Sequence, residues 1–181
     1  MTGAGIRRCA TADASLLSEL ATEAFPLACP PETTTENIRA FCEQNLSPGA
    51  FEKYLASAEI AIWIAEDSDT PVGYVMSVSG EPGDPGIARN ITLRPTVEIS
   101  KLYALSSHHG SGLAGKLLAL ALEHARNDGA ASVWLGVNQE NRRANRFYEK
   151  SGFALVGERF FQVGESLESD VVREKVLDSL A

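Results

Sequence analysis

The sequence has no long hydrophobic run. None of its apolar stretches approaches the roughly 18 residues that a membrane-spanning helix needs. Residues 1–13 hold no apolar segment after their arginine pair, so we read no secretory leader in them. These absences predict a protein that works outside membranes, and we expect it in the cytoplasm.

Cysteine and histidine are scarce. The three cysteines Cys9, Cys29 and Cys42 are widely spaced and form neither a C-x-x-C pair nor a disulfide pattern, which is typical of a reducing compartment. His108 and His109 are adjacent and would point apart on a strand, and no third ligand has suitable spacing. We therefore expect no disulfide and no metal site.

Positive charge is in the minority. Lysine and arginine number 16 against 24 acidic residues, which gives a net charge of −8. Nucleic acids and anionic membranes attract basic patches, so we expect neither as a partner. The negative net charge would suit a cationic substrate. The alternative is that it only keeps the protein soluble. Repeats, low-complexity tracts and long linkers are also missing, so residues 1–181 are expected to form one domain.

Helical and strand-like segments alternate along the chain, which predicts an α/β domain with a mixed sheet. Asp13 is expected to cap the first helix, and residues 80–90, crowded with Gly and Pro, are expected to form a loop. Strands are expected at 5–9, 59–66, 72–78, 91–93, 97–105, 132–137, 153–163 and 171–176, and helices at 14–25, 36–45, 48–55, 112–127 and 141–150.

A glycine-rich stretch, HHGSGLAGKLL at residues 108–118, precedes the longest helix and admits three interpretations. Each of them places a phosphate at the helix N-terminus, where free N–H groups attract anions. The stretch contains the dinucleotide pattern G-x-G-x-x-G and nearly spells the nucleotide phosphate loop G-x-x-x-x-G-K-[ST]. It also nearly spells [QR]-x-x-G-x-[GA], the loop that holds coenzyme A in N-acetyltransferases, through His109, Gly112 and Ala114.

Two of these interpretations lack a residue that they need. The phosphate loop requires Ser or Thr after its lysine, and Leu117 stands there. The dinucleotide fold requires a strand that runs straight into the first glycine and an acid about 20 residues further on, but polar residues 106–109 intervene and residues 135–138 carry no carboxylate. The coenzyme A interpretation fits, with a glycine-rich strand-to-helix turn that binds nothing as its alternative.

A second motif follows in residues 134–153, WLGVNQENRRANRFYEKSGF. Its pattern N-x-x-A-x-x-[FL]-Y-x-x-x-G-F is met by Asn141, Ala144, Phe147, Tyr148, Gly152 and Phe153. In this order, the two motifs resemble the GNAT superfamily of acetyl-CoA-dependent N-acetyltransferases. The resemblance implies the GNAT fold, a single domain with a mixed, mostly antiparallel central sheet flanked by helices, and acetyl-CoA as the cofactor.

Residues 24–57 and the tail 160–177 are similar to the polyamine (spermidine/spermine) acetyltransferase branch related to bacterial PaiA. The tail pattern F-x-x-G-[DE]-x-x-[QE]-x-D is met by Phe161, Gly164, Glu165, Glu168 and Asp170. Three positions depart from the branch. His109 replaces Gln or Arg in the cofactor loop, Glu158-Arg159 replaces Gly-His, and residues 24–26 replace Thr-Phe-Gly beside the expected acceptor site.

The resemblance also implies how acetyl-CoA is held. Backbone groups of Tyr103, Ala104 and Leu105 are expected to pair with the pantetheine arm as an added strand would. Asn141 is expected to bond that arm, to cap its helix, or to do both, and Asn138 shares this ambiguity. The pyrophosphate is expected to bind the glycine loop, supported by His109, through the N–H groups of Gly110, Ser111, Gly112, Leu113, Ala114 and Gly115.

Acetyl transfer to an amine needs a base, because a free alkylammonium titrates near 10.4. We expect Glu98 to be this base, directly or through water, with a solvated polar residue as its alternative. Alternation along 97–103 predicts Glu98, Ser100 and Leu102 on one face of the strand, and Ile99, Lys101 and Tyr103 on the other. We expect Tyr148 to protonate the departing thiolate, with a half-buried core tyrosine as its alternative.

The predicted function is therefore acetyl-CoA-dependent N-acetylation of a primary amine by direct attack on the thioester. The branch resemblance points to a small polyamine such as spermidine or spermine as the acceptor. The alternatives are acetylation of a protein N-terminus or lysine, and a non-catalytic acyl-CoA-binding sensor. A homodimer is left open. The acids that would line a cationic acceptor site, or else be solvated, are Glu32, Glu36, Glu165, Glu168 and Asp170.

Overall fold

A single seven-stranded sheet organises residues 4–178, which are described by the computed structural model of the chain. The strand order is β1-β2-β3-β4-β5-β7-β6. Only β4 and β5 run parallel, so the mixed, mostly antiparallel sheet is confirmed. The strands are β1 (Gly5–Arg8), β2 (Ile60–Asp67), β3 (Thr70–Ser79), β4 (Thr96–Ala104), β5 (Ser132–Asn138), β6 (Ala154–Val163) and β7 (Ser166–Val176).

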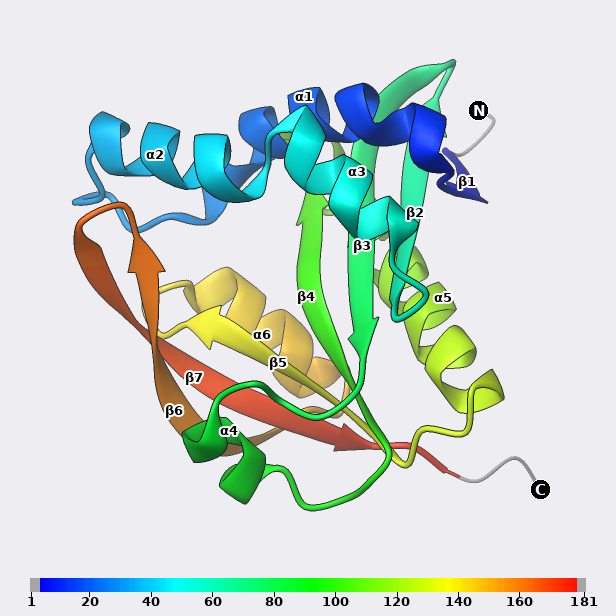
Figure 1. Cartoon of the computed structure of the whole chain (residues 1–181), viewed down its shortest axis with the longest axis vertical. Coiled ribbons are helices and arrows are strands. Elements are labelled where there is room, and N and C mark those ends of the chain that lie inside the picture. The colour runs from blue at the N-terminus through cyan, green and yellow to red at the C-terminus, as the bar shows by residue number, and fades with distance from the viewer. Residues whose placement is uncertain (1–3, 179–181) are drawn as a thin grey trace.

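Helices cover both faces of the sheet. Figure 1 shows α1, α2 and α3 grouped together and the short α4 beside β6 and β7. The first three pack on one face of β2–β4, whereas α5 and α6 contribute to the core on the opposite face. The helices are α1 (Ala14–Ala24), α2 (Thr35–Asn45), α3 (Pro48–Ala56), α4 (Pro85–Asn90), α5 (Leu113–Asn127) and α6 (Arg142–Lys150), with 3₁₀ turns η1 (Thr11–Asp13), η2 (Phe25–Ala28) and η3 (Ser106–His108).

The central strands are apolar on both sides because each side meets a helical layer. Along β3, Val75 packs against α5, whereas its neighbours Tyr74 and Met76 pack against α1–α3. All three side chains are 2% exposed or less. This alternation follows from the two-residue repeat of a strand. It fixes which residues of the neighbouring strands face each helical layer.

Three local predictions need correction. Asp13 stands at the predicted N-cap position of α1, but its carboxylate makes no capping bond, because it instead accepts from the Ala10 N–H at 2.8 Å and pairs with the Arg7 guanidinium. Residues 80–90 contain α4, which begins at a proline and is capped by Asp84. Residues 91–93 form no strand, because the N–H groups of residues 92 and 93 donate to the buried carboxylate of Glu174.

The sheet splits between its two parallel strands. β4 and β5 pair only from Thr96 to Glu98 against Ser132 to Trp134, and then diverge. Figure 1 shows this divergence of β4 and β5. From residue 99 onward, one edge of β4 therefore carries backbone groups that no strand satisfies. This unpaired edge positions the site.

Candidate active site

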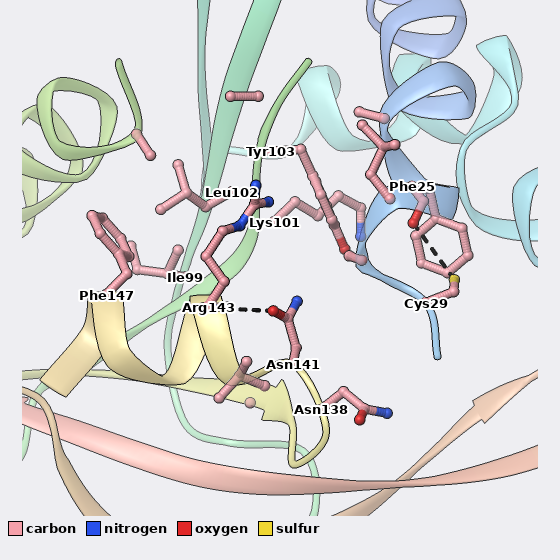
Figure 2. A pocket seen from close by; sticks show the side chains of 18 of the residues that line it. Phe25, Cys29, Ile99, Lys101, Leu102, Tyr103, Asn138, Asn141, Arg143 and Phe147 are labelled. Carbon is pink, nitrogen blue, oxygen red and sulfur yellow. Dashed lines mark hydrogen bonds between the residues drawn. The ribbon is translucent and has the colours of Figure 1, made fainter. Parts of the chain in front are cut away.

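A cavity of about 630 Å³ fills the split between β4 and β5. Figure 2 shows Lys101 and Tyr103 of β4 beside Phe25 and Cys29 of the η2 segment, with Asn141 near the start of α6. The predicted site residues that line it are Glu98, Tyr103, Ala104, His109, Gly110, Gly112, Leu113, Ala114, Gly115, Asn138, Asn141 and Tyr148. The structure thus brings most of the predicted residues to one place.

The cavity has two halves. The cofactor half is formed by residues 102–104 of β4, the loop 109–115 and residues 138–144 at the start of α6. The acceptor half is formed by residues 25–46 together with β6, β7 and the part of β4 nearest Glu98. The two halves differ in chemistry, since free backbone groups characterise the first, and charged and aromatic side chains the second.

The glycine loop presents backbone N–H groups to the cofactor half. Gly110 and Gly112 adopt φ values of 78° and 83°, where a side chain is strained, and Gly112 is the N-cap of α5. The N–H of Ser111 is already bonded to His108, and Ser111 does not line the cavity, so its predicted cofactor contact is wrong. Within residues 4–178, no protein acceptor takes the N–H groups of Gly110, Gly112, Ala114 and Gly115.

The N–H of Leu113 is less available to the cofactor than predicted. Leu113 lines the cavity, but its N–H donates to the Ser111 hydroxyl at 3.3 Å. The free N–H groups beside it lie at the positive end of the 15-residue helix α5. This arrangement is suited to an anion such as a pyrophosphate.

Fewer residues of β4 than predicted have backbone groups free for the cofactor. Leu105 uses both its backbone groups within the chain, donating to Val72 at 2.9 Å and accepting from the His108 N–H at 2.9 Å, and it does not line the cavity. Its predicted pairing with pantetheine is therefore wrong. Because alternate residues of an antiparallel strand direct their backbone groups to the partner, Leu105 and Tyr103 face β3, and Leu102 and Ala104 face the cleft. The predicted pairing of the Tyr103 backbone with pantetheine is therefore wrong as well.

His109 links two walls of the cofactor half. Its Nε2 lies 2.9 Å from the carbonyl of Ala104, and its Nδ1 contacts the guanidinium of Arg143 on α6. With its proton on Nε2, the imidazole donates to this carbonyl and offers Nδ1 as an acceptor to the guanidinium. Arg143 lines the cavity, and sequence reasoning missed it although it lies inside the second motif.

Two asparagines complete this half. Asn141 caps α6, since its Oδ1 accepts from the Ala144 N–H at 3.0 Å, and its side chain also lines the cavity. Asn138 lines the cavity as well, but its Oδ1 accepts from the Glu140 N–H at 2.9 Å. Capping therefore explains part of the role of Asn141, and its amide NH₂ is left for a ligand because no described residue bonds it.

A β-bulge in β4 decides which side chains reach the acceptor half. Ser100 is an extra residue relative to β3, so the alternation reverses after Ile99. Leu102 consequently packs toward α5 with Ile99, and its predicted place beside Glu98 is wrong. The acceptor-side face instead takes Glu98, Lys101 and Tyr103.

Glu98 is the centre of a charged cluster drawn from three strands. Its Oε1 lies 3.6 Å from Nη1 of Arg159 on β6, and Nε of Arg159 donates to Oδ2 of Asp170 on β7 at 3.2 Å. Burial raises the pKa of Glu98, and Arg159 opposes that rise. Burial also raises the pKa of Asp170. Sequence reasoning noted Arg159 as a departure but gave no sign of this pairing.

Lys101 is a second cation beside Glu98. Burial lowers the pKa of its ammonium to about 8, with Glu98 acting against the change and Arg159 adding to it. The ammonium lies 5.5 Å from the centre of the Tyr54 ring. The predicted alternation had placed Lys101 on the far face, so the bulge is the reason that it was missed.

Tyr148 lies between the two halves. It is 9% exposed and its ring packs 5.7 Å from that of Phe153 and 5.1 Å from that of Phe147. Burial raises the pKa of its phenol, which keeps the proton on the oxygen at neutral pH. Within the described chain, no residue hydrogen-bonds this hydroxyl, so the group is available as a proton donor in the cavity.

Aromatic side chains form the remaining wall of the acceptor half. Phe25 and Phe41 stack with centres 4.3 Å apart, Phe41 lies 5.5 Å from Phe161, and Phe25 meets Tyr103 edge-on at 6.3 Å. Of the predicted acids, Glu168 and Asp170 line the cavity. Those outside its lining are Glu32, Glu36 and Glu165.

Two further properties concern the whole of the described chain. Residues 4–178 contain no group of three or more His, Cys, Asp or Glu side chains placed to hold a metal ion. Their helices are all too short or too polar to cross a membrane.

Comparisons with known proteins point the same way. The model of the acetyltransferase (GNAT) family matches residues 16–153. An uncharacterized N-acetyltransferase of Mycobacterium tuberculosis is 42% identical over 165 residues, which are 91% of this chain and 98% of the relative. The PaiA N-acetyltransferase of Thermoplasma acidophilum, solved in complex with coenzyme A, has a TM-score of 0.77 at 18% identity, over 97% of this chain and 100% of that one.

A second solved structure is the putative acetyltransferase yncA of Salmonella typhimurium, determined with its cofactor acetyl-CoA. It has a TM-score of 0.61 at 22% identity and covers 99% of this chain and 97% of its own. At this level of identity, both structures show that the fold is shared.

Proposed function

The chain belongs to the GNAT family of N-acetyltransferases, and from this premise we propose that it transfers the acetyl group of acetyl-CoA to the primary amine of a small molecule. One observation carries the proposal. A single cavity combines free backbone N–H groups at the start of α5, the unpaired edge of β4, the carboxylate of Glu98 and the hydroxyl of Tyr148. Each of these groups meets one requirement of the reaction.

The cofactor half fits acetyl-CoA, which supplies an activated acyl carbon and a thiol leaving group. The N–H groups of Gly110, Gly112, Ala114 and Gly115 are placed for the pyrophosphate, with Arg143 at the mouth. The cleft-facing backbone of Leu102 and the N–H of Ala104, whose carbonyl contacts His109, suit an extended arm bound as an added strand. Backbone recognition needs no particular side chain, which is consistent with a histidine at position 109.

Glu98 is proposed as the base that takes a proton from the acceptor ammonium, directly or through water. Burial moves the pKa of Glu98 upward, closer to neutral pH, where a base is most effective. The guanidinium of Arg159 opposes this rise in pKa and so favours the ionised carboxylate. The neutral amine then forms its bond to the acyl carbon while the carbon–sulfur bond breaks.

Tyr148 is proposed as the acid that protonates the departing sulfur. Its phenol keeps its proton at neutral pH because burial raises the pKa, and its hydroxyl has no competing partner among residues 4–178. Two protons leave the acceptor nitrogen: Glu98 takes the first before attack, and the second, released as the amide forms, replaces the proton that Tyr148 gave to the thiolate. Each turnover then releases one proton in all, which Glu98 passes to solvent.

The acceptor class is less constrained than the reaction. The branch resemblance favours a polyamine, and the acids Glu98, Glu168 and Asp170 in the cavity support that candidate. The cations Arg159 and Lys101 among them count against it. The aromatic wall suits an acceptor with an apolar body. A small primary amine satisfies all of these features.

The test is release of coenzyme A from acetyl-CoA by the purified protein, with phenethylamine, spermidine, putrescine, lysine, an N-terminal peptide or no acceptor. We expect turnover with at least one small amine above the rate without acceptor. Turnover with the peptide alone would overturn the small-molecule proposal in favour of protein acetylation. Binding of acetyl-CoA without turnover on any acceptor would favour a non-catalytic sensor.

A further inference from the structure

Arg159 occupies the space between two carboxylates of the acceptor half. Its Nε lies 3.2 Å from Oδ2 of Asp170 and its Nη1 lies 3.6 Å from Oε1 of Glu98. The Arg159 side chain is only 16% exposed. A cationic group of a bound diamine or polyamine would seek the same two carboxylates, because no other pair of acids among the described residues is so deeply buried in the cavity lining.

The fold is adapted to this guanidinium. Gly136 of β5 lies directly beneath it, and a Cβ at that position would overlap the guanidinium atoms. The guanidinium carbon lies 5.8 Å from the centre of the Trp134 ring and 5.3 Å from that of Phe161. Packing against a glycine and two aromatic rings holds Arg159 in the cavity, as cation–π contacts favour.

Most of the negative charge in this half is balanced by residues of the chain itself. Arg159 and Lys101 together offset the carboxylates of Glu98 and Asp170, which leaves one further acid, Glu168, in the lining. The pKa of Lys101 is lowered partly by Arg159. One ammonium is compatible with this cluster, because Glu98 can accept its proton. A second ammonium would meet two fixed cations at close range, where like charges repel strongly.

We propose that Arg159 determines acceptor selectivity by filling the place of a second cationic group. The site then selects a monoamine with an aromatic or apolar body, which the wall of Phe25, Phe41 and Phe161 accommodates, and rejects diamines and polyamines. This inference rests on the proposed function and narrows its substrate class. The replacement of Gly-His by Glu158-Arg159 would then change which amines the site accepts.

The experiment compares kcat/KM for phenethylamine and spermidine in the wild type, Arg159→Met and Arg159→Lys. We expect the wild type to prefer phenethylamine at least tenfold. Arg159→Met should lower that preference at least tenfold, chiefly through a lower KM for spermidine, and Arg159→Lys should largely retain it. The ratio is the informative quantity, because loss of Arg159 also alters the pKa of Glu98 and so changes kcat for every amine.

A second measurement needs no variant and stands even if Arg159→Met does not fold. Spermidine, at ten times the phenethylamine concentration that gives half-maximal rate, should not inhibit acetylation of phenethylamine by the wild type. The inference is overturned if the wild type acetylates spermidine as well as the monoamine, or if Arg159→Met lowers kcat/KM for both amines by one common factor. Absence of turnover with every amine would instead overturn the proposed function, and this inference with it.

Discussion

The two halves of the cavity recognise their ligands by different means. The cofactor half offers backbone groups from consecutive residues, held by a glycine loop and a helix N-terminus. The acceptor half offers side chains from strands far apart in the chain, among them Glu98 and Arg159. Backbone recognition tolerates sequence change, whereas a cluster of paired side chains does not. One scaffold can thus keep its cofactor and change its acceptor.

The largest expected effect tests the acceptor half. Glu98→Gln should lower kcat/KM by about 10²- to 10⁴-fold, the usual contribution of a general base. Because burial raises the pKa of Glu98, activity of the wild type should fall as the pH drops through a value above the ordinary range of a glutamate, and this limb should vanish in the variant. Steady-state rates against pH measure both.

The control for this variant is the affinity for acetyl-CoA. This affinity should change less than threefold, because Glu98 belongs to the acceptor half. The turnover rate, in contrast, should fall by at least about 10²-fold, because the base is lost. A parallel loss of acetyl-CoA binding would contradict the division of the cavity. Calorimetric titration of the variant supplies the comparison.

Tyr148 lies where the halves meet, and its removal should have the second largest effect. Tyr148→Phe should lower kcat by about 10²-fold, the lower end for an acid–base group, because a thiolate is a good leaving group. Phe147→Leu serves as the matched control on the same helix, since Phe147 also lines the cavity but carries no proton. Equal rates for Tyr148→Phe and the wild type would remove the tyrosine from the mechanism.

A change in the cofactor half should act on binding instead. Gly112→Ala places a side chain at a φ of 83°, which costs about 1–2 kcal/mol. The free loop can relieve this strain by leaving the conformation that presents its N–H groups, and binding must restore that conformation, so we expect roughly tenfold weaker binding of acetyl-CoA. The relative kcat/KM values of different amines should not change. Gly49→Ala in α3, where a Cβ meets nothing within 4 Å, is the control that should leave affinity unaltered.

The smallest effect concerns stability. The unfolded chain holds the Lys101 proton up to about pH 10.4, whereas the folded protein releases it above a pKa of about 8. Between these values the unfolded state binds more protons, so the free energy of unfolding should rise with pH, by at most about 1.4 kcal/mol per pH unit. Denaturant titrations of the wild type and Lys101→Met should differ in this rise, and identical pH dependence would contradict the buried ammonium.

The same contrast explains what could be predicted from the sequence. The glycine loop and the capping Asn141 depend on neighbouring residues, so their local pattern was sufficient. The alternation of residues 97–103 breaks at Ser100 and Lys101, which are both polar, but whether such a break is a bulge depends on the pairing with β3, which the local sequence does not specify. The pairing of Arg159 with Glu98 depends on strands that are distant in sequence, and no local signal marks it.

The most direct test of the account is amide hydrogen exchange of the wild-type protein with and without coenzyme A. If backbone recognition holds the cofactor, exchange should slow at Leu102 and Ala104 of β4. It should also slow at Gly110, Gly112, Ala114 and Gly115, where no protein acceptor protects the loop amides among the residues described. Exchange at residues 25–46 and 158–170 should change little. Protection confined to those two segments, with none in the loop, would contradict the central claim.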